Sequence, residues 1–298
     1  MKITGLHLLL TYQCNFECDH CFVWGGPKQS GVMTLQDIRR ILAQGQALGT
    51  VESIYFEGGE PFLYYAVLLQ AVREAARLGF QVGLVSNAYW ATGIEDAIEW
   101  LKPFIGLVQD LSVSSDLFHY DEAISQQSRH AAAAAELLGI PLGTISIAQP
   151  QSPDAIAAIG QIPTGDEATL MYRGRAAAKL ASRAQEQPWE KLVECPYEDL
   201  HDPGRLHVDP LGYLHICQGI TIGNLFQEPL DQIIDRYAPE AHPITGALLA
   251  GGPAELVRRY SLPHRASYAD ACHLCYESRL ALRQCYPEIL APSQMYGQ

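Results

Sequence analysis

The sequence lacks several features that would assign a protein to a broad class at once. No run of 18 apolar residues occurs, so the sequence predicts no transmembrane helix. No cluster of lysines and arginines occurs, and the formal net charge of −13 disfavours general electrostatic binding to nucleic acid. Residues 1–4 are too few and too polar to head a signal peptide, and we therefore expect a cytoplasmic protein with no membrane partner.

Common catalytic motifs are missing as well. The sequence has no G-x-x-x-x-G-K phosphate loop, no G-x-S-x-G elbow and no H-E-x-x-H zinc motif. Cysteine is absent from residues 22–194, so the eight cysteines fall into an N-terminal and a C-terminal group. In a cytoplasmic protein, such groups indicate metal ligands or redox groups before disulfides. The cysteine distribution therefore predicts two separate sites.

Short apolar segments alternate with helical patterns in the first part of the chain. The predicted strands are residues 5–11, 51–57, 80–87, 106–114, 141–147 and 167–172. The predicted helices are residues 38–48 (after a capping box of Thr34 and Asp37), 65–78, 94–101 and 121–138. This order predicts an α/β fold with a parallel sheet, curved into a partial (βα)6 TIM-like barrel that binds ligands at the carboxyl ends of its strands. We place the barrel in residues 1–185 and a small hairpin-and-helix domain in residues 186–298.

The first cysteine group is a C-x3-C-x2-C motif, formed by Cys14, Cys18 and Cys21 after the first predicted strand. Three thiolates so close in sequence can converge on one metal site. A zinc ion normally takes four ligands. A 4Fe–4S cluster held by three cysteines instead leaves one iron without a protein ligand, where a cofactor can bind. A zinc knuckle is the alternative.

A second motif, Glu57-Gly58-Gly59-Glu60-Pro61, follows the second predicted strand. By itself, a Gly-Gly pair indicates a turn before a helix. Here the motif falls at the same edge of the predicted sheet as the cysteines. Its glycines permit the backbone to approach a ligand closely, and Glu60 supplies a carboxylate.

Together the two motifs resemble those of the radical S-adenosylmethionine (radical SAM) enzymes, over about residues 5–180. The resemblance implies that Cys14, Cys18 and Cys21 hold a 4Fe–4S cluster whose open iron binds the methionine part of S-adenosylmethionine. In that family, one electron breaks the S–C5′ bond, and the resulting 5′-deoxyadenosyl radical abstracts hydrogen from a substrate. It also implies an external electron donor such as flavodoxin or ferredoxin.

The resemblance further implies a set of cofactor contacts. They are Gly58, Gly59, Glu60 and Pro61 near the amino group, Ser86 and Asn87 near the ribose, Ser112, Ser114 and Asp116 after the fourth strand, His20 and Phe22 near the adenine, and Arg175 near the carboxylate. Solvated polar residues at strand ends are the alternative for several of these. Glu57 stands where the family often has a small residue. Glu57, His119 and Tyr120 are candidates for substrate contact, and no catalytic residue is assigned.

The second cysteine group surrounds a predicted hairpin, residues 205–217, and continues in Cys272-His-Leu-Cys275. Cys195, Cys217, Cys272 and Cys275 form two separated pairs, a pattern that permits zinc or iron–sulfur. The segment resembles the SPASM and twitch extensions of radical SAM enzymes. The resemblance implies one auxiliary 4Fe–4S cluster held by these four cysteines. In the rival assignment Cys285 replaces one of the C-x2-C pair.

These observations predict an enzyme that abstracts hydrogen from a peptide or protein side chain, leading to oxidation or cross-linking. Radical dehydrogenation of a small molecule such as an amino sugar is the alternative. A non-catalytic iron–sulfur or zinc scaffold would explain the cysteines. It would leave the Gly-Gly-Glu-Pro motif and the six βα units unexplained.

Overall fold

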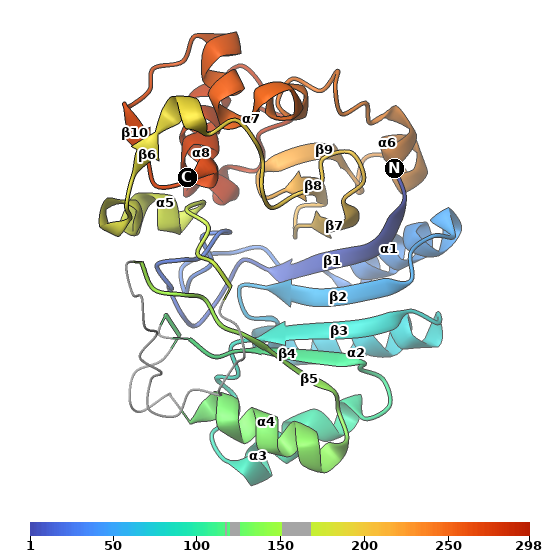
Figure 1. Ribbon diagram of the computed structural model, residues 1–298. Coiled ribbons are helices and arrows are strands. Elements are labelled where there is room, and N and C mark those ends of the chain that lie inside the picture. Colours follow the sequence, from blue (N-terminus) through green and yellow to red (C-terminus); the bar gives the residue numbers. More distant parts are fainter. Residues whose placement is uncertain (117, 120–125, 151–167) are drawn as a thin grey trace. The chain divides into compact units, whose positions relative to one another are not determined.

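The computed structural model describes residues 1–116, 118–119, 126–150 and 168–298 (Figure 1). The chain divides into two compact units. We call Thr4–Cys18 with Gly25–Leu170 the sheet unit, and Met1–Ile3, Asp19–Trp24 and Met171–Gln298 the C-terminal unit. The predicted domain boundary at residue 185 stays a prediction.

The sheet unit contains five parallel strands in the order β5-β4-β3-β2-β1 (Figure 1). The strands are β1 Ile3–Thr11, β2 Ser53–Gly58, β3 Gln81–Ser86, β4 Asp110–Ser114 and β5 Leu142–Ile145. The helices between them are α1 Leu35–Leu48, α2 Tyr65–Arg77, α3 Ile94–Leu101 and α4 Gln127–Leu138, with short 3-10 helices η1 Pro61–Tyr64 and η2 Lys102–Phe104. The expected α/β class with a parallel sheet is confirmed.

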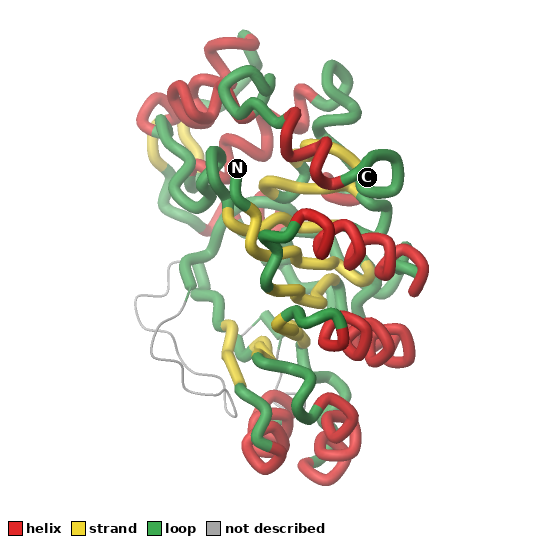
Figure 2. Tube along the Cα trace, turned by 90° about the vertical axis from the view of Figure 1, so that its right-hand side faces the viewer, coloured by secondary structure: helices red, strands yellow, loops and turns green. Residues whose placement is uncertain are grey.

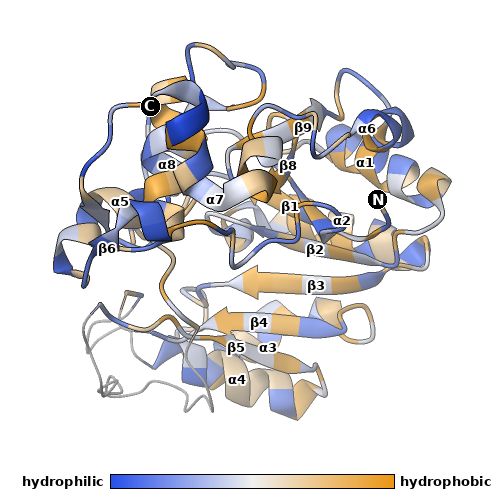
Figure 3. Cartoon of the chain, turned by 45° about the horizontal axis from the view of Figure 1, so that its top comes forward, coloured by the Kyte–Doolittle hydropathy of each residue, from blue (hydrophilic) through white to orange (hydrophobic). Residues whose placement is uncertain are grey.

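The core of the sheet unit lies between the strands and their helices. Leu6, Phe56 and Leu84 are at most 1% exposed. Leu6 faces Gly45 of α1, where an added Cβ would lie 3.4 Å from a Leu6 methyl carbon. Figure 2 shows the helices of this unit on one side of the strands, and Figure 3 shows β3 and β4 as largely apolar. The strands therefore bury one face under the helices, as βαβ units do.

The capping box predicted before the first helix is present. The Asp37 amide donates to Thr34 Oγ1 at 3.2 Å, and the Thr34 amide donates to Asp37 Oδ2 at 2.9 Å. These bonds satisfy N–H groups that the helix itself leaves without acceptors. At the other end, Gly49 adopts a φ of 76°, which ends α1 in a left-handed cap.

The predicted sixth strand is not formed as a strand in its described residues, 168–172. Within them, Ala168 makes one parallel bridge to Ile147. The neighbouring strand β5 has only four residues, and its side chains are partly exposed. Such a short edge offers few backbone groups on which a further strand can be built. Of the predicted helix 121–138, residues 121–125 lie outside the described residues, and residues 127–138 form α4.

The C-terminal unit combines a small antiparallel sheet with helices. Its strands are β7 Gly204–Val208, β8 Tyr213–Cys217 and β9 Ile220–Asn224, with a separate pair of β6 Gln187–Pro188 and β10 Ser267–Tyr268. Its helices are α5 Arg175–Lys179, α6 Leu230–Arg236, α7 Thr245–Tyr260 and α8 Ala271–Leu282, and its 3-10 helices are η3 Ala181–Arg183, η4 Trp189–Lys191 and η5 Ser293–Tyr296. The predicted hairpin is therefore present as β7 and β8. Across the described part of the chain, no helix has the length and apolarity needed to cross a bilayer.

Candidate functional site

The Gly-Gly pair brings the end of β2 against the chain that leaves β1. The Gly59 amide donates to the Thr11 carbonyl at 2.7 Å, and the Glu60 amide donates to the Gln13 carbonyl at 2.9 Å. A Cβ on Gly59 would lie 2.2 Å from the Gln13 oxygen, and Gly58 has a φ of +146°. Both glycines are therefore required by the protein's own backbone. Their close approach places Glu60 beside the segment that carries Cys14.

Glu60 is completely buried and holds the ends of two strands together. Its Oε1 accepts from the Phe62 amide and from Ser86 Oγ, both at 3.0 Å, and its Oε2 accepts from the Asn87 amide at 2.8 Å. Burial raises the pKa of Glu60 to about 7, although these hydrogen bonds act in the opposite direction. Pro61, the next residue, begins η1. The carboxylate thus lies at the carboxyl end of the parallel sheet, between β2 and β3.

Asn87 extends this arrangement to the first cysteine. Its Nδ2 lies 2.9 Å from Asn15 Oδ1 and 3.6 Å from Cys14 Sγ. The Phe16 amide also donates to Cys14 Sγ, at 3.4 Å. Donors around a buried thiol favour its thiolate form, which is the form that binds iron. Cys14, Glu60, Ser86 and Asn87 are therefore gathered in the sheet unit.

Asp116 and His119 form a second polar group after β4. Asp116 Oδ1 lies 2.8 Å from His119 Nδ1 and accepts from the Phe118 amide at 3.0 Å. Burial lowers the pKa of His119, but hydrogen bonds and charge from Asp116 and Cys18 raise it to about 10. The His119 ring also meets Phe16 edge-on at 6.2 Å. His119 therefore lies against the cysteine loop, whereas Tyr120 lies outside the described residues.

Polar side chains also line the face of the sheet opposite the helices. Glu57 Oε2 lies 3.5 Å from His7 Nδ1, and the His7 ring stacks on Tyr55 at 4.6 Å. Tyr55 donates to Asp110 Oδ2 at 3.1 Å, and Ser112 Oγ donates to the same oxygen at 3.2 Å. Glu57 and Ser112 thus belong to polar contacts within the sheet. Ser114, two residues after Ser112 in β4, is buried.

The remaining residues of the predicted first site belong to the C-terminal unit. His20, Cys21 and Phe22 are half-buried. A Cβ on Gly174 would lie 2.5 Å from the Phe22 carbonyl oxygen, so the chain at Gly174 packs directly on this segment. The Arg175 amide donates to the Cys21 carbonyl at 2.9 Å, and the Arg175 guanidinium lies 5.4 Å from the Trp24 ring centre.

Four cysteines of the C-terminal unit line one pocket, with an empty volume of about 420 Å³ that includes its open side. They are Cys195, Cys217, Cys272 and Cys275. Burial, with the charges of Cys217 and Cys275, raises the pKa of Cys195 to about 12. Burial raises the pKa of Cys272, and the charges of the same two thiols act in the same direction. Cys285 is exposed and is not among the residues that line the pocket.

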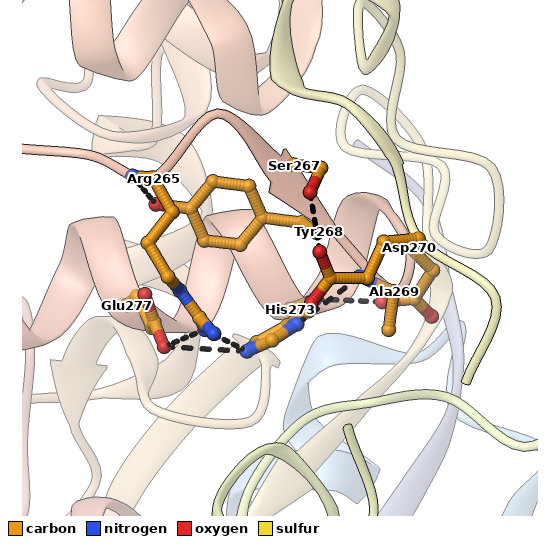
Figure 4. A network of polar contacts seen from close by, with 8 residues as sticks. Arg265, Ser267, Tyr268, Ala269, Asp270, His273 and Glu277 are labelled. Atoms are coloured by element: carbon orange, nitrogen blue, oxygen red, sulfur yellow. Dashed lines mark hydrogen bonds and ion pairs between the residues drawn. The ribbon is translucent and has the colours of Figure 1, made fainter. Parts of the chain in front are cut away.

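The start of α8, which carries two of these cysteines, is held by a polar network (Figure 4). Asp270 caps the helix by accepting from the His273 amide at 2.7 Å. The buried His273 ring accepts from the Ala269 amide through Nδ1 at 3.2 Å, and its Nε2 lies 3.2 Å from Glu277 Oε1. Arg265 contacts both His273 and Glu277. These contacts fix the helix end on which the C-x2-C pair lies.

Two buried arginines in the same pocket were not predicted from the sequence. Arg173 is 6% exposed, and its Nη1 donates to Cys217 Sγ at 3.4 Å and to Glu198 Oε1 at 3.3 Å. Arg279 is 2% exposed, and its Nη1 donates to the Gln218 carbonyl at 2.6 Å. Arg173 stands two residues before Arg175, and no pattern in the sequence distinguishes the arginine that reaches the cysteines from its neighbour.

Residues 8–130 match the Radical SAM superfamily, and the matched range contains both the C-x3-C-x2-C and the Gly-Gly-Glu-Pro motifs. Members of this family use a 4Fe–4S cluster and S-adenosylmethionine.

The curated relatives are similar to a limited part of the chain. The putative peptide biosynthesis protein YydG of Bacillus subtilis (strain 168) is 30% identical over 111 residues, which are 37% of this chain and 35% of the relative. The S-adenosylmethionine-dependent nucleotide dehydratase of Fibrobacter sp. (strain UWH6) is 26% identical over 128 residues, 40% of this chain and 36% of the relative. The chain thus matches about a third of the length of these relatives.

Among solved structures, Streptococcus suis SuiB bound to the precursor peptide SuiA is 13% identical, with a TM-score of 0.46. The alignment covers 91% of this chain and 76% of SuiB. The resemblance depends on the superfamily match and on the motifs within it. Residues 8–130 thus match the Radical SAM superfamily, and the comparisons show the family for this part of the chain alone.

Proposed function

We propose that this protein is a radical SAM enzyme that oxidises or cross-links a peptide or protein side chain with the help of an auxiliary 4Fe–4S cluster. The observation that carries the proposal is the four-thiol pocket in a chain that also has a radical SAM domain. Four convergent thiols are the donor set of a structural zinc ion or of an iron–sulfur cluster, either of which would bind them as thiolates.

The residues of the C-x3-C-x2-C and Gly-Gly-Glu-Pro motifs suit S-adenosylmethionine and its cluster. Cys14, Cys18 and Cys21 would hold the cluster and leave one iron open, and N–H groups already surround the Cys14 sulfur. The buried Glu60 carboxyl is suited to a cationic amino group, since a charge-assisted hydrogen bond would offset its desolvation. When bound, the cluster and cofactor supply a 5′-deoxyadenosyl radical that takes a hydrogen atom from the substrate.

The other cofactor contacts remain proposals of the same kind. Asp116 fixes the chain after β4 by accepting from the backbone, and it orients His119. His119 and Glu57 are the candidates for substrate contact in the described residues. Arg175 is proposed to contact the cofactor carboxylate, and Ser86 and Asn87 to contact its ribose side.

The second pocket suits a cluster in which every iron has a protein ligand. Cys195, Cys217, Cys272 and Cys275 line it, while the exposed Cys285 does not. The buried Arg173 and Arg279 supply positive charge beside the thiolates. Such a cluster would supply one-electron chemistry to the reaction, and a structural zinc ion is the competing occupant.

The choice of a peptide substrate is supported by the name of YydG, a putative peptide biosynthesis protein. The nucleotide dehydratase of Fibrobacter favours the second candidate, a small-molecule substrate such as a nucleotide or an amino sugar. An external flavodoxin or ferredoxin would supply the electron. The two substrate classes are separated by incubating the reduced enzyme with peptides encoded beside its gene and measuring loss of hydrogen atoms by mass spectrometry.

The cleavage of S-adenosylmethionine tests the proposed function directly. The reconstituted protein, reduced with dithionite without oxygen, should release 5′-deoxyadenosine, measured by liquid chromatography. Cys18→Ala should abolish this release because the cluster loses a ligand. Cys285→Ala should leave it unchanged, because that side chain is exposed and outside the four-thiol pocket. Release that survives Cys18→Ala would contradict the proposal.

A further inference from the structure

We propose that Arg173 and Glu198 set the reduction potential of the auxiliary cluster, with Arg173 raising it and Glu198 lowering it. This inference rests on the proposed function, because it assumes that Cys195, Cys217, Cys272 and Cys275 hold an iron–sulfur cluster. It adds that the two side chains act on the electron affinity of that cluster, and it makes opposite predictions for them.

Arg173 donates directly to a cysteine sulfur in the pocket. Its Nη1 lies 3.4 Å from Cys217 Sγ, and its side chain is 7% exposed. Arg279 also lines the pocket; it donates to the Gln218 and Cys275 carbonyls, lies against Tyr296, and acts to lower the pKa of the Cys275 thiol. Arg173 differs from Arg279 in that its guanidinium contacts a cysteine sulfur and the Glu198 carboxylate together.

A second observation indicates that an acceptor belongs in this pocket. Arg173 Nε is buried and has no hydrogen-bond partner among the described residues. A buried N–H without an acceptor is destabilising, and more so when it is charged. Sulfur atoms in the pocket would give this group the acceptor that the protein does not supply. The orphaned donor, like the four thiols, therefore fits a sulfur-rich anionic group.

The charge of such a group gives the sign of the effect. Four thiolates around a cluster core with two positive charges leave two negative charges, and one-electron reduction makes three. A guanidinium that is always protonated stabilises the more negative state, so it raises the reduction potential. Hydrogen bonds to the cysteine sulfur act in the same direction because they withdraw electron density.

Glu198 opposes the effect of Arg173 on the reduction potential of the cluster. Its Oε1 lies 3.3 Å from Arg173 Nη1, and its side chain is 12% exposed. The carboxylate shares the guanidinium that Cys217 contacts, so it reduces the positive charge available to the cluster. Low exposure keeps solvent from screening this pair as it screens surface ion pairs.

The position of Arg173 also depends on the N-terminal cysteine segment. Its guanidinium lies 5.5 Å from the centre of the Phe22 ring, and Phe22 follows Cys21. The next residue, Gly174, packs against the backbone of Cys21 and Phe22. A cation–π contact and a tightly packed backbone thus hold Arg173 toward Cys217. Arg173 is a positioning and tuning residue in this account, not a catalytic one.

The test measures the potential of the auxiliary cluster alone. Full-length protein with Cys14, Cys18 and Cys21 all changed to Ala retains only the four-thiol pocket as a cluster site. In this background we expect about four iron atoms per chain. A redox titration followed by electron paramagnetic resonance should give a lower midpoint for Arg173→Met and a higher midpoint for Glu198→Gln. Each change should shift the reduced-to-oxidised ratio at least tenfold, which is about 59 mV for one electron.

Arg258→Met is the matched control. Arg258 also stacks on an aromatic ring, that of Trp189, but it is exposed and does not line the pocket. Its substitution should leave the midpoint unchanged. The inference would be overturned if the midpoints of Arg173→Met and Glu198→Gln shifted in the same direction, or if neither shifted. A merely structural role of the two side chains does not predict shifts of opposite sign.

Two further outcomes are distinguishable. If the background protein holds no iron, the proposed auxiliary cluster itself fails, and the inference fails with it. If Arg173→Met alone loses its iron, Glu198→Gln still decides the question, because a raised midpoint supports the inference and an unchanged or lowered one overturns it.

Discussion

Glu60 is a carboxyl group that folding removes from water, and its protonation is therefore coupled to stability. Its pKa rises to about 7 in the folded chain, mainly through burial, from the ordinary value of 4.5. The folded state thus binds the Glu60 proton more tightly than the unfolded state. The stability that this proton provides is complete below about pH 4.5 and is lost as the pH rises through about 7.

Glu60→Gln isolates this effect because the amide does not titrate. The unfolding free energy of the cofactor-free wild-type protein, minus that of Glu60→Gln, should fall on the order of 3 kcal/mol between about pH 4.5 and about pH 7. Urea unfolding at several pH values measures it, and other titrating groups cancel in the difference. A difference that grows with pH would mean that Glu60 is stabilised as a carboxylate by its hydrogen bonds.

At the residue scale, the sequence showed which motif residues are candidates for the site better than it showed which residues contact one another. The positions of Cys14 after the first strand and of Glu60 after the second were sufficient to place these two residues at one sheet edge. Arg173 could not be found in this way. Its contact with Cys217 spans 44 residues and depends on how Gly174 packs against Phe22, which no local pattern encodes.

At the scale of the element, the end of β2 depends on two glycines that allow backbone to meet backbone. A Cβ on Gly59 would overlap the Gln13 oxygen at 2.2 Å, and neither backbone can yield without breaking the hydrogen bonds between them. We expect Gly59→Ala to destabilise the protein by about 1–3 kcal/mol or more, the range for overpacked cores. It should also lower cofactor cleavage, because Glu60 and Cys14 would separate.

Gly93→Ala provides the matched control for this prediction. Gly93 precedes α3, has an extended φ of −157°, and has no atom within 4 Å of an added Cβ. Because Gly93 is the N-cap of α3, its substitution should cost on the order of 0.5–1 kcal/mol, less than Gly59→Ala. Equal effects of the two substitutions in urea unfolding would show that the close approach at Gly59 does not limit stability.

Elements with local signals were predictable, and elements set by neighbours were not. Helix α3 has the predicted bounds Ile94–Leu101, and α1 begins at its predicted capping box. The predicted sixth strand had a suitable sequence. Its described residues make one bridge, beyond the four-residue edge strand β5, and do not form a strand. Helix α7 contains a kink at Gly251 and Gly252, before Pro253, that depends on packing against Val193 and Glu194 rather than on periodicity.

At the scale of the whole molecule, the proposed function assigns seven of the eight cysteines to two sites. The three N-terminal cysteines belong to the radical SAM range, residues 8–130. Four others line the pocket of the C-terminal unit, and the eighth, Cys285, is exposed. This distribution was visible in the sequence as two groups. The pocket lining favours the C-x2-C pair over Cys285, which lies beyond the end of α8, and the sequence spacing alone could not show this.

The measurement that tests the central claim most directly is the content of iron, zinc and acid-labile sulfide per chain, after reconstitution and desalting without oxygen. Two 4Fe–4S clusters predict about eight iron and eight sulfide. The claim also predicts about half of each when Cys14, Cys18 and Cys21 are changed to Ala. One zinc ion with about four iron would contradict the auxiliary cluster, and zinc with little sulfide would contradict the account as a whole.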